Sequence, residues 1–94
     1  MYKIYVSYDM REGKEEDCQR YFSQVLGPTL NRNGATVAEV WYTIWGNSPQ
    51  FQSGSVVGSQ AELRRLLSST KWREVLSGLE PLVTNLNIRT LRAR

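Results

Sequence analysis

The sequence contains no histidine and a single cysteine, Cys18. Histidine is the commonest general base near neutral pH and the commonest metal ligand. Its absence excludes a Ser-His-Asp triad, a Cys-His pair, a His-ligated haem and an ordinary catalytic zinc site. One cysteine cannot hold an iron–sulfur cluster. We therefore expect a protein that works without a metal and without an organic cofactor.

Long apolar runs and phosphate-binding loops are also missing. No apolar run approaches the ~18 residues that a membrane span needs. The start of the chain, MYKIYVSYD, lacks the basic start, the long apolar stretch and the small-residue cleavage site of a signal peptide. The segment SGSVVGSQ has neither the G-x-G-x-x-G nor the GK[ST] pattern. These absences predict a cytoplasmic protein without a membrane partner.

Size and charge are ordinary. Ninety-four residues predict one domain, 1–94, and 40% apolar with 22% charged residues is typical of a globular protein. Much of the net charge of +3 comes from the tail IRTLRAR, with Arg89, Arg92 and Arg94. We interpret this tail as a solvated end, because a nucleic-acid surface usually needs a larger basic patch with interleaved aromatic residues.

Alternation of side-chain type predicts four strands, at residues 2–9, 36–46, 51–58 and 83–91. One set of alternate positions suits a core: Ile4, Val6, Val40, Tyr42, Ile44, Leu86 and Ile88. The opposite set is mixed, with large aromatic residues beside polar and charged ones: Tyr5, Ser7, Val37, Glu39, Trp41, Thr43, Trp45, Asn85, Asn87 and Arg89. The turn GNSP separates the second strand from the third.

Two helical regions separate the strands. The first opens with REGKEED and carries Cys18 in its apolar stripe as a small core residue. It should kink or end at Gly27-Pro28, with a further helical turn from Pro28 as the alternative to an end there. The second opens with the capping box Ser59 to Glu62 and continues, after a new cap at Ser69 or Thr70, to Pro81. Its second part places one apolar stripe against the sheet: Trp72, Val75, Leu76 and Leu79.

The order strand, helix, strand, strand, helix, strand predicts a ferredoxin-like α+β fold. In this fold an antiparallel sheet carries both helical regions on one face. The other face would expose two or three large aromatic side chains in a monomer. Such an apolar patch usually marks an interface or a ligand site.

This order, the aromatic strand ending WYTIWGNSPQ and the later LLSSTKWREVL resemble the dimeric α+β barrel superfamily, especially its antibiotic-biosynthesis-monooxygenase-like and NIPSNAP-like members. The resemblance runs from Met1 to Arg92. It implies a homodimer whose two sheets pack their open faces together, so that the partner or a ligand covers the tryptophans. The chain differs from the haem-degrading and chlorite-dismuting branches of the superfamily, because those branches bind haem through a histidine. It also differs from most NIPSNAP-like members, because its third strand lacks their aromatic residues.

The resemblance also implies a small hydrophobic or aromatic ligand, held between the sheets or between sheet and helices. Superfamily members include cofactor-independent monooxygenases, cyclases and isomerases. A dry cavity can raise the pKa of a carboxylate and turn it into a base. Glu39 is the carboxylate expected mid-strand on the open face and is our candidate base, with an ion pair to Arg89 of either subunit as the alternative. Candidate ligand contacts are Tyr5, Trp41, Thr43, Trp45, Asn85, Asn87 and Arg89, and each could instead serve packing or face solvent.

Three hypotheses follow. The barrel could catalyse a cofactor-independent reaction, or it could be a non-catalytic ligand-binding or interaction module. An RNA-binding ferredoxin-like domain is disfavoured, because the RNP1-type pattern is absent and the third strand lacks stacking aromatics. We therefore expect no nucleic-acid partner. The sequence leaves the first two hypotheses open.

Overall fold

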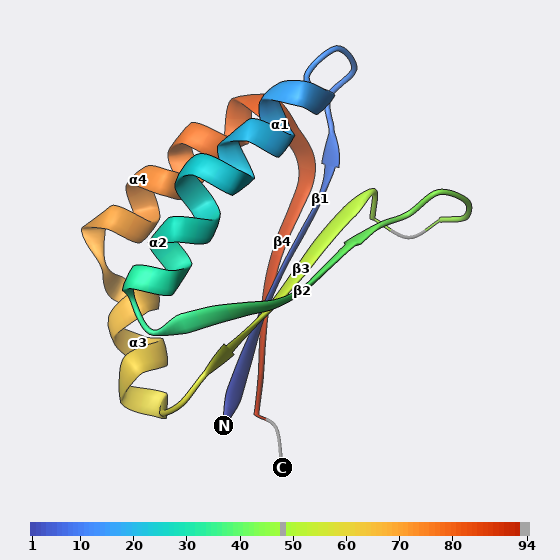
Figure 1. The fold of residues 1–94 in the computed structure, drawn as a ribbon. Helices are drawn as coiled ribbons and strands as arrows, with labels where there is room; N and C mark the ends of the chain where they lie inside the picture. The colour runs from blue at the N-terminus through green and yellow to red at the C-terminus, as the bar shows by residue number, and fades with distance from the viewer. Residues whose placement is uncertain (48, 93–94) are drawn as a thin grey trace.

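A computed structural model describes residues 1–47 and 49–92 and shows one antiparallel sheet with all its helices on one face (Figure 1). The predicted α+β, ferredoxin-like class is confirmed. Ser48 of the predicted turn and Arg94 of the basic tail lie outside the described residues. The elements are β1 (Tyr2–Met10), α1 (Glu15–Tyr21), η1 (Phe22–Leu26), α2 (Gly27–Arg32), β2 (Ala35–Tyr42), β3 (Phe51–Val57), α3 (Gln60–Ser68), α4 (Thr70–Leu79), η2 (Glu80–Leu82) and β4 (Val83–Arg92).

The strands are arranged in the order β2-β3-β1-β4, and every neighbouring pair is antiparallel. The central strand β1 therefore pairs with both β3 and β4. Its even-numbered residues from Ile4 to Tyr8 are buried under the helices. We call this the covered face, and we call the opposite side, which carries Tyr5 and Ser7, the open face.

The first helical region passes through Gly27-Pro28 without ending. The segment η1 is a π-helix, and the Gly27 N–H donates to the carbonyl of Phe22, five residues earlier. Pro28 has no N–H to donate, and its ring would clash with the Gln24 carbonyl of a regular α-helix. The wider π turn accommodates the proline, so α1, η1 and α2 follow one another as a continuous helical path.

The serine caps predicted for the second helical region, Ser59 and Ser69, are confirmed. Ser59 Oγ accepts the Glu62 N–H at 3.2 Å, and Ser69 Oγ accepts the Trp72 N–H at 3.1 Å. Each satisfies an amide that the helix itself leaves without a partner. The helix α4 ends before Pro81, and its predicted stripe faces the sheet, with Trp72 and its neighbours Val75 and Leu79 buried.

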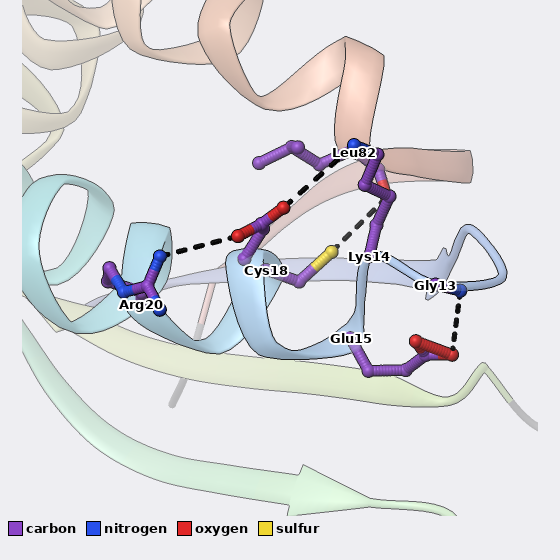
Figure 2. Close-up of polar contacts among 7 residues, drawn as sticks. Gly13, Lys14, Glu15, Cys18, Arg20 and Leu82 are labelled. Atoms are coloured by element: carbon purple, nitrogen blue, oxygen red, sulfur yellow. Dashed lines mark hydrogen bonds and ion pairs between the residues drawn. The ribbon is translucent and has the colours of Figure 1, made fainter.

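The core lies between the covered face and the helices. Phe51 is at its centre: its ring stacks on Tyr8 at 4.6 Å and meets Phe22 edge-on at 4.9 Å. Cys18 is buried as predicted, and its thiol donates to the Leu82 carbonyl at 3.2 Å (Figure 2). Burial raises the pKa of this thiol, which keeps it protonated and inert.

The second strand is shorter than predicted. Its last ladder pair is Tyr42 with Phe51, so residues 43–47 and 49–50 belong to the loop between β2 and β3. Gly46 has φ +115°, and Thr43 Oγ1 donates to the Pro49 carbonyl at 2.6 Å, which closes the loop on itself. The predictions that Ile44 faces the core and that Thr43 and Trp45 lie on the sheet are therefore wrong. Ile44 and Trp45 are 97% and 95% exposed.

A bulge changes the face of one more residue. Val37 pairs with Ser55 and Glu39 with Gly54, so Ala38 is an extra residue in β2. The extra residue turns Val37 to the covered face, contrary to the prediction that it shares a face with Glu39. Beyond the bulge the outer end of the β2–β3 hairpin projects past the helices (Figure 1), so Val40 and Tyr42 stay exposed although they lie on the covered side.

Candidate functional site

One row of residues crosses the open face, with a member from every strand. Tyr5 pairs with Arg89 on one side and with Gly54 on the other, and Gly54 pairs in turn with Glu39. The Arg89 Cζ atom lies 5.4 Å from the centre of the Tyr5 ring, a cation–π contact. A Cβ atom at Gly54 would lie 3.1 Å from Tyr5 Cε1. A side chain at this position would press against the tyrosine ring, so the glycine leaves room for the ring above β3.

A pocket of about 190 Å³ opens beside this row. We call it the open-face pocket, and its lining consists of Tyr5, Ser7, Pro49, Gln52, Asn87 and Arg89. Three predicted ligand contacts, Tyr5, Asn87 and Arg89, come together here from two adjacent strands. The lining combines an aromatic ring, a proline, a hydroxyl, two amides and one guanidinium.

A second pocket of about 300 Å³ adjoins the first. It is lined by Trp41, Tyr42, Thr43, Pro49 and Gln52. Because Pro49 and Gln52 line both pockets, the predicted contacts Trp41 and Thr43 lie next to the open-face pocket and not inside it. Trp45 is farther out and lines a wide hollow of about 570 Å³ around the loop itself.

Asn85 has a structural task at the end of the sheet. It adopts φ +54° at a bulge in β4, a conformation that asparagine tolerates better than most residues. Its Nδ2 donates to Asp9 Oδ2 at 2.8 Å, and Asp9 Oδ1 accepts the Gln50 N–H at 3.0 Å. These hydrogen bonds, that of Asn85 most, hold the pKa of Asp9 below its usual range. Asp9 thus links Gln50, which lies between Pro49 and the start of β3, to the edge strand β4.

Glu39 and Arg89 are on opposite edge strands of the sheet. Three strand spacings separate them, roughly 14 Å at the usual spacing of neighbouring strands. None of the ion pairs among residues 1–47 and 49–92 joins the two side chains. An ion pair within one chain is therefore excluded, and a pair between subunits stays a prediction. The Glu39 side chain is exposed in the single chain.

Two serines on the covered face were not singled out from the sequence. Ser53 and Ser55 are buried, and neither hydroxyl has a hydrogen-bond partner in the part of the chain that the structure describes. They face the helices between pairs of aliphatic residues on the neighbouring strands. An unpaired buried hydroxyl costs about 1–3 kcal/mol. Such groups mark a place where a polar ligand or water would be favourable.

The contacts that sequence analysis missed are Ser7, Pro49 and Gln52. Ser7 had been placed on the correct face, and Gln52 shares that face by simple alternation along β3. Among residues 1–47 and 49–92, no three side chains of the His, Cys, Asp and Glu types gather as a metal site requires. Within the same residues, no helix has both the length and the apolar composition needed to cross a membrane.

The arrangement defines a ferredoxin-like protein with one uncovered sheet face and a small polar–aromatic pocket on it. No protein-family model matches the chain, and no curated protein matches its sequence. Solved structures do match. A NIPSNAP domain protein from Burkholderia xenovorans has a TM-score of 0.74 at 13% identity, over 100% of this chain and 95% of its own.

Two further structures extend the similarity. A Mycobacterium tuberculosis protein has a TM-score of 0.76 at 10% identity, over 99% of this chain and 94% of its own. An Arabidopsis thaliana protein has a TM-score of 0.83 at 7% identity, over 100% of this chain and 96% of its own. At such low identities the similarity establishes the fold alone. The chain therefore has a NIPSNAP-like fold, as the resemblance implied.

Proposed function

We propose that the chain, as one domain, forms a homodimer through its open face and binds a small aromatic molecule there. The observation that carries this proposal is the open-face pocket, because it joins an aromatic ring to polar side chains that make no hydrogen bonds to other side chains among residues 1–47 and 49–92. Ligand sites usually combine an apolar lining with a few convergent polar groups. The buried free thiol of Cys18 fits a reducing compartment such as the cytoplasm.

The dimer part rests on apolar side chains at both edges of the open face. Trp41 on β2 is 47% exposed, and Leu91 on β4, which pairs with Lys3, is 44% exposed. A second copy laid against this face would bury both edges and turn the shallow pocket into an enclosed chamber. Enclosure would lower the local dielectric and strengthen every polar contact to a ligand inside.

The catalytic form of the proposal assigns Glu39 as a base. A proton would pass from an acidic carbon of the bound molecule to the Glu39 carboxylate, and the electron pair would stay on the molecule as an enolate. This step suits an isomerase, a cyclase or the first stage of a cofactor-independent monooxygenase. Glu39 and Tyr5 line one small pocket, and Tyr5 also lines the open-face pocket, so Glu39 of the same chain or of the partner subunit would supply the base. The alternative is the same dimer without chemistry, a ligand-binding or protein-interaction module.

Sedimentation velocity at micromolar concentration tests the dimer. We expect two chains per particle for the wild type and one folded chain for Trp41→Glu, which places a charge in the interface. Ala61→Glu is the matched control, since it adds the same charge to the exposed side of α3. A wild-type protein that stays monomeric, or a Trp41→Glu variant that still dimerises, would refute an interface through the open face.

A second candidate site lies between the covered face and the helices. The unpaired hydroxyls of Ser53 and Ser55 favour it, because they are polar atoms without protein partners in an otherwise apolar layer. A small hydrophobic molecule with one polar group would satisfy them. The change in the free energy of unfolding when these hydroxyls are removed distinguishes an occupied layer from an empty one.

A further inference from the structure

We infer that the open-face pocket selects an anion: a single aromatic ring that carries one acidic group, with Arg89 as the anchor of that group. This inference rests on the proposed ligand-binding function and specifies the chemical class of the ligand. It follows from the charge of the pocket, the orientation of Arg89 and the size of the space.

The charge of the pocket is positive and uncompensated. Its lining contains one guanidinium and no carboxylate, and the remaining polar side chains are neutral. The ion pairs among residues 1–47 and 49–92 all lie on or beside α1, where Lys14 and Arg20 meet acidic neighbours (Figure 2). No carboxylate in that part of the chain lies within ion-pair distance of Arg89. A concave surface with a single positive group concentrates anions.

The orientation of Arg89 suits a carboxylate. The contact with the Tyr5 ring holds the guanidinium over that ring, and none of the hydrogen bonds among the described side chains uses its N–H groups. A guanidinium presents its donors as a planar fork that matches the two oxygens of a carboxylate. Asn87 lies two residues earlier on the same face and also lines the pocket, so its amide can donate to the same acidic group.

The size of the pocket limits the ligand to one ring. Its volume of about 190 Å³ is smaller than the roughly 300–1,000 Å³ of pockets that hold drug-sized molecules. Tyr5 and Pro49 provide apolar surface for one flat ring, while Ser7, buried in the lining, adds a hydroxyl. A fused polycyclic compound would extend into the neighbouring pocket at Trp41 and would need the dimer to cover it.

Isothermal titration with benzoate and benzamide tests the inference. The two probes have nearly the same shape, and only benzoate carries a charge. We expect benzoate to bind more tightly, and we expect Arg89→Gln to weaken benzoate binding roughly 10- to 100-fold while benzamide binding changes little. Arg89→Lys keeps the charge without the fork and should retain part of the affinity.

Arg92→Gln is the matched control, because it removes the same charge from the same strand outside the pocket. Equal losses in Arg89→Gln and Arg92→Gln would overturn the inference in favour of general surface charge. Equal binding of benzoate and benzamide, unaffected by Arg89→Gln, would overturn the inference and leave the proposed aromatic site standing. Binding of neither probe at millimolar concentration would overturn both. Circular dichroism of each variant verifies that a lost affinity does not reflect a lost fold.

Discussion

The two faces of the sheet are built from the same strands but follow different rules. On β1, Ile4 and Val6 face the helices and are buried, whereas Tyr5 and Ser7 between them face the open side. On β3, Phe51 is at the centre of the core, and its neighbour Gln52 lines the open-face pocket. The covered face holds the residues that folding requires. The open face holds a guanidinium, amides and half-exposed aromatics that the fold of one chain does not explain.

This difference predicts that substitutions on the two faces should affect different properties: stability on the covered face, and binding or assembly on the open face. Burial of apolar area stabilises by about 25 cal/mol per Å², so residues on the covered face contribute most of the folding free energy. Apart from the buried Ser7 and Gly54, residues on the open face stay partly or fully exposed in the single chain. We therefore expect changes there to alter binding or assembly much more than folding.

The largest expected effect tests the covered face directly. Phe51→Ala removes a ring that contacts Tyr8, Phe22 and Tyr42, and we expect it to reduce the free energy of unfolding by about 3–5 kcal/mol. Gln52→Ala, one residue later on the opposite face, should change it by about 0.5 kcal/mol or less. Urea unfolding of both variants measures the contrast. Similar losses in the two variants would show that the open face also belongs to the folding core.

The second prediction concerns the polar exception on the covered face. If the layer around Ser53 is empty, Ser53→Ala removes an unpaired buried hydroxyl and should raise the free energy of unfolding by about 1–3 kcal/mol. Thr29→Val is the control, because the Thr29 hydroxyl is buried but donates to the Val25 carbonyl at 2.7 Å. That variant should lose stability. A loss in Ser53→Ala as well would mean that a ligand or water uses the hydroxyl, and would favour the second candidate site.

The covered face could be predicted from the sequence better than the open face, for a physical reason. Burial imposes a strict period of two on strands, so Ile4, Val6 and Ile88 were assigned correctly from alternation alone. The same holds for the caps, since Ser59 and Ser69 act through local hydrogen bonds. These features depend on residues close together in the sequence.

The candidate site depends on residues far apart, and there the sequence analysis was less accurate. The bulge at Ala38 shifts the alternation of β2 by one residue. Nothing in the local sequence indicates this bulge, and Val37 was therefore assigned to the wrong face. The length of β2 was overestimated because Ile44 and Trp45 continue the apolar alternation into the loop. Pro49 belongs to the loop between β2 and β3 and not to a strand, so its place in the pocket lining could not be identified from spacing.

The third prediction concerns Asp9 near the end of the central strand β1. Hydrogen bonds from Asn85 and Gln50 lower the pKa of Asp9 from its usual 3.8, so its ionised form stabilises the folded state. That stabilisation is fully present above pH 3.8 and is lost as the pH falls through the lower folded-state value. Because Asp9 is well solvated, we expect it to amount to less than about 1 kcal/mol.

Thermal melting of Asp9→Asn against the wild type measures this contribution. The variant should melt at a lower temperature near neutral pH, and the gap should close in acid. Glu12→Gln, a change to an exposed carboxylate in the next turn, should show no such convergence. A gap that persists unchanged below the folded-state pKa would show that Asp9 acts through packing and not through its charge.

The smallest expected effect decides between two uses of Arg89. If the partner's Glu39 paired with Arg89 in the dimer, Glu39→Gln and Arg89→Gln would be coupled by about 0.5–3 kcal/mol, as contacting residues usually are. If Arg89 is instead reserved for the acid group of a ligand, the two changes should be additive to within about 0.5 kcal/mol in the ligand-free protein. We expect additivity, because the pocket beside Arg89 needs the guanidinium unpaired to attract an anion.

Chemical denaturation of the wild type, the two single variants and the double variant gives the coupling free energy. The same cycle in the Trp41→Glu background, where we expect one chain per particle, is the control, since an inter-subunit pair cannot contribute there. Strong coupling that disappears in this background would assign Arg89 to the interface and would contradict its role as a ligand anchor. Additivity in both backgrounds, together with selective loss of benzoate binding in Arg89→Gln, would show that the Arg89 guanidinium serves a ligand and not the partner subunit.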